Sequence, residues 1–156
     1  MDYFQNGPAI SEAFASGDLD FAEFGEQAAI AGISAEYGYK IIGATATRET
    51  MYPLVVNKDI TDAQGLKGAK IAVSVGTSAH YLLLTYLESL GLTENDIELV
   101  NTNDTVTLLA SGEVQGAADQ LAKFNSMIEP ATCTCLRTER QRHLPDQRLF
   151  RPYRVL

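Results

Sequence analysis

The sequence has no apolar run long enough to cross a bilayer, and it does not start like a secretory signal. A membrane-spanning helix needs roughly 18 or more consecutive apolar residues. A signal peptide needs a basic start followed by an apolar core. The chain instead begins Met1-Asp2-Tyr3-Phe4. We therefore expect a soluble chain that carries no export signal.

Basic side chains are scarce. Lysine and arginine together number 12, against 20 acidic residues, and the net charge is −8. Proteins that bind nucleic acid need a basic face to contact phosphates, so this balance argues against a nucleic-acid partner. Apolar residues make up 46% of the 156 positions. That share is enough for a buried core, and it excludes a disordered or fibrous chain.

The basic charge that is present lies largely at the C-terminal end. The first 130 residues hold six basic and 18 acidic side chains, whereas residues 131–156 hold six arginines, no lysine and two acids. Residues 131–137 show no apolar period of 2 or 3.6. This tail does not resemble part of the preceding fold. It is either a basic interaction tail or a segment from a shifted reading frame or cloning junction.

Cysteine is also rare. The two cysteines, Cys133 and Cys135, form a single Cys-x-Cys in the tail, without companion ligands nearby. A structural zinc site needs about four ligands. We expect no metal site.

Strands and helices alternate through the rest of the chain. Runs rich in apolar or β-branched residues predict strands at 19–22, 39–44, 52–57, 70–75, 97–100 and 114–118. Helices are predicted from Pro8 to Gly17, over 28–33, from 78 to 90, over 104–111, and in a short segment closed by 66–68. In the helix after Ser78, apolar residues recur with the spacing of a core-packed face, and Gly91 ends it. This alternation predicts α/β architecture with largely parallel sheets, whose ligand sites lie where strands end and helices begin.

The best candidate site is the segment Val75-Gly76-Thr77-Ser78-Ala79-His80, where a strand turns directly into a helix. The first N–H groups of a helix have no intrahelical partner and carry partial positive charge, so they favour an anion. The hydroxyls of Thr77 and Ser78 add neutral donors. The alternative is that one of these hydroxyls only caps the helix. No Gly-Lys-Ser/Thr follows, so this is not a nucleoside-triphosphate loop.

Two further pairs of residues stand at similar strand-to-helix openings. Glu26 and Gln27 follow one predicted strand and turn, and Asp119 and Gln120 follow the strand 114–118. Glu26 is either an acid favoured at a helix N-terminus or a cleft residue. If it faces the cleft, the ligand also carries a positive group.

His80 is a candidate for lining the cleft. It does not form a nucleophilic pair with Ser78, because residues two apart on a helix point away from each other. We identify no catalytic residue, and we expect neither enzymatic activity nor a cofactor.

Two stretches of the chain carry a family resemblance. Residues 60–73 read Ile-Thr-Asp-Ala-Gln-Gly-Leu-Lys-Gly-Ala-Lys-Ile-Ala-Val, and residues 76–83 read Gly-Thr-Ser-Ala-His-Tyr-Leu-Leu. Both are similar to periplasmic binding proteins of ABC importers for sulfonates, taurine and nitrate. The similarity extends back through 7–14, 16–21 and Gly25 and forward through 111–114, and so covers roughly residues 5–123.

The resemblance implies a two-lobed periplasmic-binding-protein (type II, Venus-flytrap) α/β fold with an incomplete first lobe. Residues 1–51 would form part of lobe one, 52–123 lobe two, and 124–156 the discordant tail. The family's ligand loops correspond to Gly25-Glu26-Gln27 and Gly76-Thr77-Ser78, with Asp119-Gln120 as a third. The implied partners are a small anionic or zwitterionic solute and a membrane permease, and the implied location is the periplasm or cell surface.

The chain also departs from the family pattern. Gln115 stands where an Asp is common, and Glu26 where a small or amide residue is usual, so a simple sulfonate is not assured. The family's first strands precede the point where this chain starts, and we therefore expect self-association. Two alternatives remain open. The chain could be a non-functional truncated or frameshifted fragment, or an enzyme resembling thiamine-pyrimidine synthases, with Lys123 and His80 as its nearest reactive residues.

Overall fold

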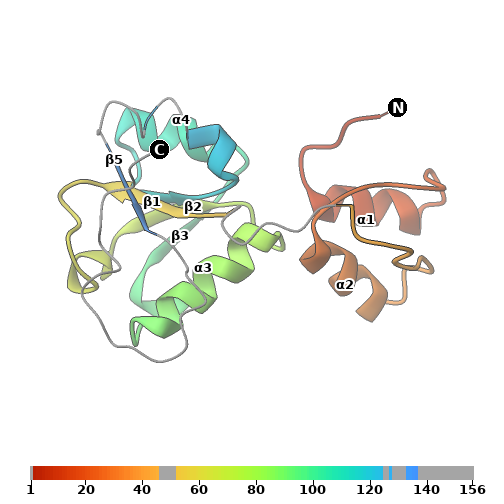
Figure 1. Cartoon of the computed structure of the whole chain (residues 1–156), viewed down its shortest axis with the longest axis horizontal. Helices are drawn as coiled ribbons and strands as arrows, with labels where there is room; N and C mark the ends of the chain where they lie inside the picture. The colour runs from red at the N-terminus through yellow and green to blue at the C-terminus, as the bar shows by residue number, and fades with distance from the viewer. Residues whose placement is uncertain (1, 46–51, 125–126, 128–132, 137–156) are drawn as a thin grey trace.

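A computed structural model describes residues 2–45, 52–124, 127 and 133–136. Helices α1 (Gly7–Ala15) and α2 (Glu26–Ser34) form a small lobe, which lies to one side of a larger lobe that holds the sheet (Figure 1). The longest helix among the described residues has 12 residues, and none there is long and apolar enough to span a bilayer.

The larger lobe is built on a five-stranded mixed sheet. Its order is β3 (Glu98–Asn101), β2 (Lys70–Val73), β4 (Gly116–Ala118), β1 (Leu54–Asn57) and β5 (Cys133–Leu136). Strand β2 pairs in parallel with β3 and β4, whereas β1 is antiparallel to β4 and β5. The four predicted strands of this lobe are therefore present; β1, β2 and β4 are shorter than their sequence runs, and β3 is shifted by one residue.

Strand β5 lies where the sequence predicts no regular element. All four of its residues pair with β1. Strand pairing uses backbone N–H and C=O groups, so a segment can add to an open sheet edge without any side-chain period. This part of the tail is therefore a strand of the sheet.

Helices cover both faces of the sheet, which makes three layers. Along β1, Leu54 and Val56 pack with helix α3 (Ser78–Ser89), whereas Val55 packs on the other face with helix α4 (Thr105–Ser111). This is the two-residue alternation of a strand buried on both sides. Phe124, in the short 3-10 helix Leu121–Phe124, is fully buried against the α4 face.

The predicted helices are confirmed. Helix α1 starts at Gly7 with Asn6 as its N-cap, and α2 starts two residues before the stretch predicted for it. Helix α3 is followed by Gly91 in the left-handed conformation (φ 72°), as its sequence predicts. Short 3-10 helices occupy Gln64–Leu66 and Glu94–Asp96. The strand–helix boundaries before α3 and α4 thus lie where an α/β site requires them.

Two predicted strands, 19–22 and 39–44, are not strands in the structure. A strand needs a partner for its backbone ladder, and the described part of the small lobe supplies none. Several of their apolar side chains therefore stay in solvent: Phe21 is 78% exposed and Ile42 is 85% exposed. The small lobe is thus two helices with extended segments and an uncovered apolar surface.

Candidate functional site

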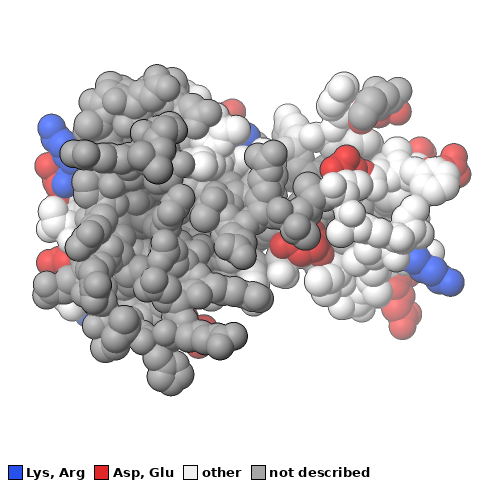
Figure 2. All heavy atoms as spheres, in the orientation of Figure 1, with Lys and Arg blue, Asp and Glu red and all other residues white. Residues whose placement is uncertain are grey.

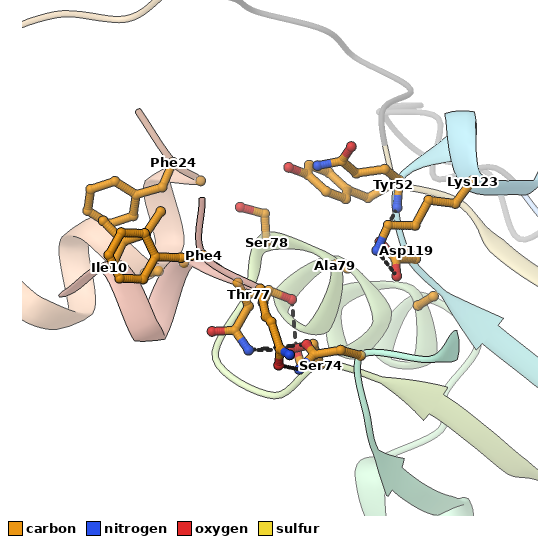
Figure 3. Close-up of a pocket in the computed structure, with 18 of the residues that line it drawn as sticks. Phe4, Ile10, Phe24, Tyr52, Ser74, Thr77, Ser78, Ala79, Asp119 and Lys123 are labelled. Atoms are coloured by element: carbon orange, nitrogen blue, oxygen red, sulfur yellow. Dashed lines mark hydrogen bonds and ion pairs between the residues drawn. The ribbon is translucent and has the colours of Figure 1, made fainter. Parts of the chain in front are cut away.

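A cavity of about 220 Å³ lies between the two lobes. The N-terminal ends of three helices open onto it: Asn6 and Gly7 of α1, Gly25 before α2, and Thr77 and Ser78 of α3. Figure 3 shows the small-lobe side chains Phe4, Ile10 and Phe24 facing Ser78 and Tyr52 of the larger lobe. Three partial positive charges therefore converge on one space.

The start of α3 forms one wall. Thr77 is the N-cap; its hydroxyl donates to the Ser74 carbonyl at 2.7 Å and accepts from the His80 N–H at 3.4 Å. Ser78 follows with a side chain only 2% exposed, and its Oγ makes no hydrogen bond of ordinary length within the described residues. Tyr52 is close enough for the Ser78 hydroxyl to influence the pKa of its phenol. A ligand acceptor in the cavity would give this buried hydroxyl a further partner.

The start of α1 connects the two lobes. Asn6 caps its helix by accepting from the Ala9 N–H at 3.0 Å. Its amide nitrogen donates across the interface to Asn103 Oδ1 at 3.1 Å and to Ser74 Oγ at 3.4 Å. One residue therefore caps α1 and holds this helix end against the larger lobe.

The N-terminus of α2 has no side-chain cap. Gly25 is its N-cap and provides no side chain to accept from the first N–H groups. A Cβ at Gly25 would lie 2.7 Å from Ser78 Oγ, so the backbone approaches α3 closely only because this residue is glycine. The free N–H groups of α2 thus remain available to a ligand.

Two charged residues lie together on the larger-lobe wall. Lys123 Nζ is 2.8 Å from Asp119 Oδ2, and the same oxygen accepts from Thr105 Oγ1 at 2.7 Å. Asp119 Oδ1 accepts from the Gln120 N–H at 2.7 Å. Figure 3 shows the Asp119–Lys123 pair beside Tyr52. The acid at this wall is therefore already neutralised by an internal cation.

Tyr52 stands between these groups. Burial raises its pKa above the ordinary 10.0, and the negative charge of Glu26 raises it further. Hydrogen bonding with Ser78 and Gln120 acts in the opposite direction. The phenol is therefore neutral at physiological pH and serves as a hydroxyl donor or acceptor in the cavity.

The surface around the cavity is acidic. Residues 2–45 include seven acidic side chains and one lysine, and Figure 2 shows acidic groups on the small lobe, including near its junction with the larger lobe. Exposed charges are screened over about 8–10 Å by physiological salt, whereas helix ends inside a cavity are screened less. The helix ends inside the cavity are therefore screened less than the exposed acids around it.

Five of the predicted site residues line the cavity: Gly25, Thr77, Ser78, Asp119 and Gln120. Four others lie outside its lining. Glu26 is exposed and acts on Tyr52 through its charge. Gln27 follows it in α2. Gly76 forms the turn before α3 (φ 80°), and its N–H donates to His80 Nδ1 at 3.4 Å, so these two residues shape the turn.

Sequence reasoning missed several lining residues, among them Asn6, Tyr52, Asn103 and Lys123. The sequence around Asn6 does indicate a helix start, because Asn immediately before Gly-Pro is a typical N-cap. The other three reach the cavity only through the packing of separate segments.

The model of the NMT1/THI5 like family matches residues 3–131. The chain belongs to this family.

Two relatives of this NMT1/THI5 like chain are named as binding proteins. The taurine-binding periplasmic protein of Escherichia coli (strain K12) is 28% identical over 116 residues, which are 73% of this chain and 36% of that protein. A protein of Bacillus subtilis (strain 168) named for binding aliphatic sulfonates is 40% identical over 77 residues, 48% of this chain and 23% of the relative. Both are named as binding proteins and neither as an enzyme.

A solved structure supports the same relationship. The periplasmic aliphatic sulphonate binding protein SsuA from Escherichia coli superposes with a TM-score of 0.72 at 25% identity. The match covers 86% of this chain and 45% of that protein. The chain thus has the α/β fold of periplasmic binding proteins over less than half of their length.

Proposed function

We propose that this chain is the solute-binding component of an ABC importer and captures a small anion, such as an alkanesulfonate, taurine or nitrate, between its two lobes. The observation that carries the proposal is the convergence of the α1, α2 and α3 N-termini on one cavity, beside the buried hydroxyl of Ser78, which makes no hydrogen bond of ordinary length within the described residues. Each helix end contributes about half a positive charge and unpaired N–H donors.

Each lobe would supply some of the hydrogen-bond donors to the anion. Thr77 and Ser78 would hold the anion from α3, and the N–H groups after Gly25 would hold it from α2. Gly76 and His80 would keep the α3 turn in place. Asp119 and Gln120 would line the opposite wall. Because both lobes supply donors, binding would favour the closed arrangement, and closure is what a permease would recognise.

The size and lining of the cavity also support a small solute. A volume of about 220 Å³ is below the roughly 300–1,000 Å³ of sites for drug-sized ligands. Phe4, Ile10 and Phe24 add apolar walls that suit a short alkyl group. The names of the taurine-binding and aliphatic-sulfonate-binding relatives support the same ligand class and a periplasmic location.

Isothermal titration of the 156-residue chain with propanesulfonate, taurine and nitrate tests the proposal, with sodium chloride as the reference anion. We expect saturable binding of at least one of the three. Absence of any binding by a folded chain would contradict the proposal and favour a non-functional fragment.

The variant Ser78→Ala makes the test specific to the site. It should weaken anion binding about tenfold, because one donor to the anion is lost. Ser89→Ala, at the other end of α3, is the matched control and should leave affinity unchanged.

A further inference from the structure

We propose that Lys123 acts as an internal counter-ion that makes the cavity select anions without an ammonium group over zwitterions of the same shape. This inference rests on the function proposed above, and it concerns which members of the ligand class are accepted. The residues that carry it are Asp119, Lys123, Thr105 and Glu23.

The cavity has two carboxylates and one ammonium in its lining: Asp119, Glu23 and Lys123. A ligand ammonium buried in this space would be compensated best by a carboxylate oxygen, because a charge without an opposite partner is costly to bury. Such compensation requires a free acceptor position on Asp119 or Glu23.

Asp119 has three of the roughly four acceptor positions of its carboxylate occupied. Its Oδ2 receives Lys123 Nζ at 2.8 Å and Thr105 Oγ1 at 2.7 Å, while Oδ1 receives the Gln120 N–H at 2.7 Å. The Asp119 side chain is 13% exposed, so water contributes little to its solvation. A ligand ammonium would have to displace Lys123 or share Oδ1 with the Gln120 N–H, and in either case it would bring a second cation close to the Lys123 ammonium.

Glu23 offers a weaker alternative. It is exposed at the cavity rim, and its Oε1 accepts from Thr45 Oγ1 at 2.6 Å. Ion pairs at exposed positions contribute roughly 0–1 kcal/mol. This is less than the cost of removing an ammonium from water, so Glu23 does not compensate for the occupied Asp119.

The opposite face of the cavity favours an uncharged tail. Phe4, Ile10 and Phe24 face the larger lobe from the small lobe (Figure 3). A methyl group is stabilised by this wall, whereas an ammonium is not. The oxyanion head would remain at the helix ends in either case, so the two ligand types differ only at the tail.

Propanesulfonate and taurine are a matched pair for this inference, because taurine carries an ammonium where propanesulfonate carries a methyl group. Titration calorimetry on the 156-residue chain should give an affinity for propanesulfonate at least about tenfold higher than for taurine. Equal affinities, or a preference for taurine, would overturn the inference and leave the proposed function intact. If neither ligand binds, the proposed function itself is wrong.

Lys123→Gln identifies the residue responsible. Removing the amine frees Asp119 Oδ2, so the ratio of the propanesulfonate to the taurine affinity should fall about tenfold. Loss of the Lys123 charge would weaken the binding of both sulfonates equally. This effect therefore cancels in the ratio of the two affinities. Adding Asp119→Asn to this variant should restore the preference, because the freed acceptor for an ammonium is then gone.

Two control variants complete the experiment. Lys70→Gln removes a lysine of the same exposure, 47%, whose partner Glu98 lies outside the cavity, and it should not change the ratio. Glu23→Gln should not change it either. An unchanged ratio in Lys123→Gln with a native circular dichroism spectrum, or a changed ratio in Glu23→Gln, would refute the role of Lys123.

Discussion

Gly25 and Ser78 meet across the two lobes, with so little space between them that a Cβ on Gly25 would lie 2.7 Å from Ser78 Oγ. One residue precedes α2 and the other begins α3, so the contact brings two helix N-termini together. The absence of a side chain at Gly25 is therefore what allows both helix ends to face one cavity.

Gly25→Ala should lower anion affinity at least about tenfold, because the added methyl group forces the Ser78 hydroxyl or the α2 terminus to move. Titration with propanesulfonate measures the change. Gly43→Ala is the matched control, since a Cβ there meets no heavy atom within 4 Å. A Gly25→Ala variant that binds as tightly as the unmodified chain would show that this contact does not shape the site.

Tyr52 should make stability depend on pH at the alkaline end. Its pKa in the folded chain is raised above 10.0, chiefly by burial. Below pH 10 the phenol is protonated in both states and contributes nothing to the dependence. Above that value the unfolded chain loses the proton first, so the free energy of unfolding falls as pH rises.

Urea unfolding across this alkaline range, compared between the unmodified chain and Tyr52→Phe, isolates the effect. The variant should show the weaker dependence on pH. If the two curves run parallel, Tyr52 ionises equally in the folded and unfolded states, and its position beside Glu26 and Asp119 has no electrostatic consequence.

Phe124→Ala should destabilise the larger lobe by about 3–5 kcal/mol, because the ring is fully buried against Val55 and Leu109. Phe21→Ala removes the same side chain from a position that is 78% exposed, and should change stability by less than about 0.5 kcal/mol. Thermal or urea unfolding compares them. Similar losses in both variants would contradict the placement of Phe124 in the core.

The uncovered apolar surface of the small lobe should make the chain self-associate. Ile42 is 85% exposed and Phe21 78%, in extended segments that pair with no strand among the described residues. Ile42→Lys should lower the sedimentation coefficient at high concentration. Tyr81→Lys changes a residue that is 51% exposed on α3 and should have a smaller effect.

Prediction from sequence succeeded where local patterns are sufficient. The apolar stripe of α3, its opening after Gly76-Thr77-Ser78 and its end at Gly91 are all short-range features, and they lie where expected. The predictions of strands at 19–22 and 39–44 were wrong, because a strand depends on a partner strand, which a local pattern does not reveal. Strand β5 was missed for the related reason that pairing to an edge needs no side-chain pattern.

The sequence by itself determined the α/β alternation, the family, and the helix start that offers Thr77 and Ser78, because each depends on residues close together in the chain. Only the tertiary structure decided that the N-terminus of α1 also lines the cavity, that Glu26 lies outside the lining, and that Lys123 forms an ion pair with Asp119. These features depend on distances between segments up to about a hundred residues apart, as in the Asn6–Asn103 hydrogen bond, and side-chain periodicity does not encode such distances.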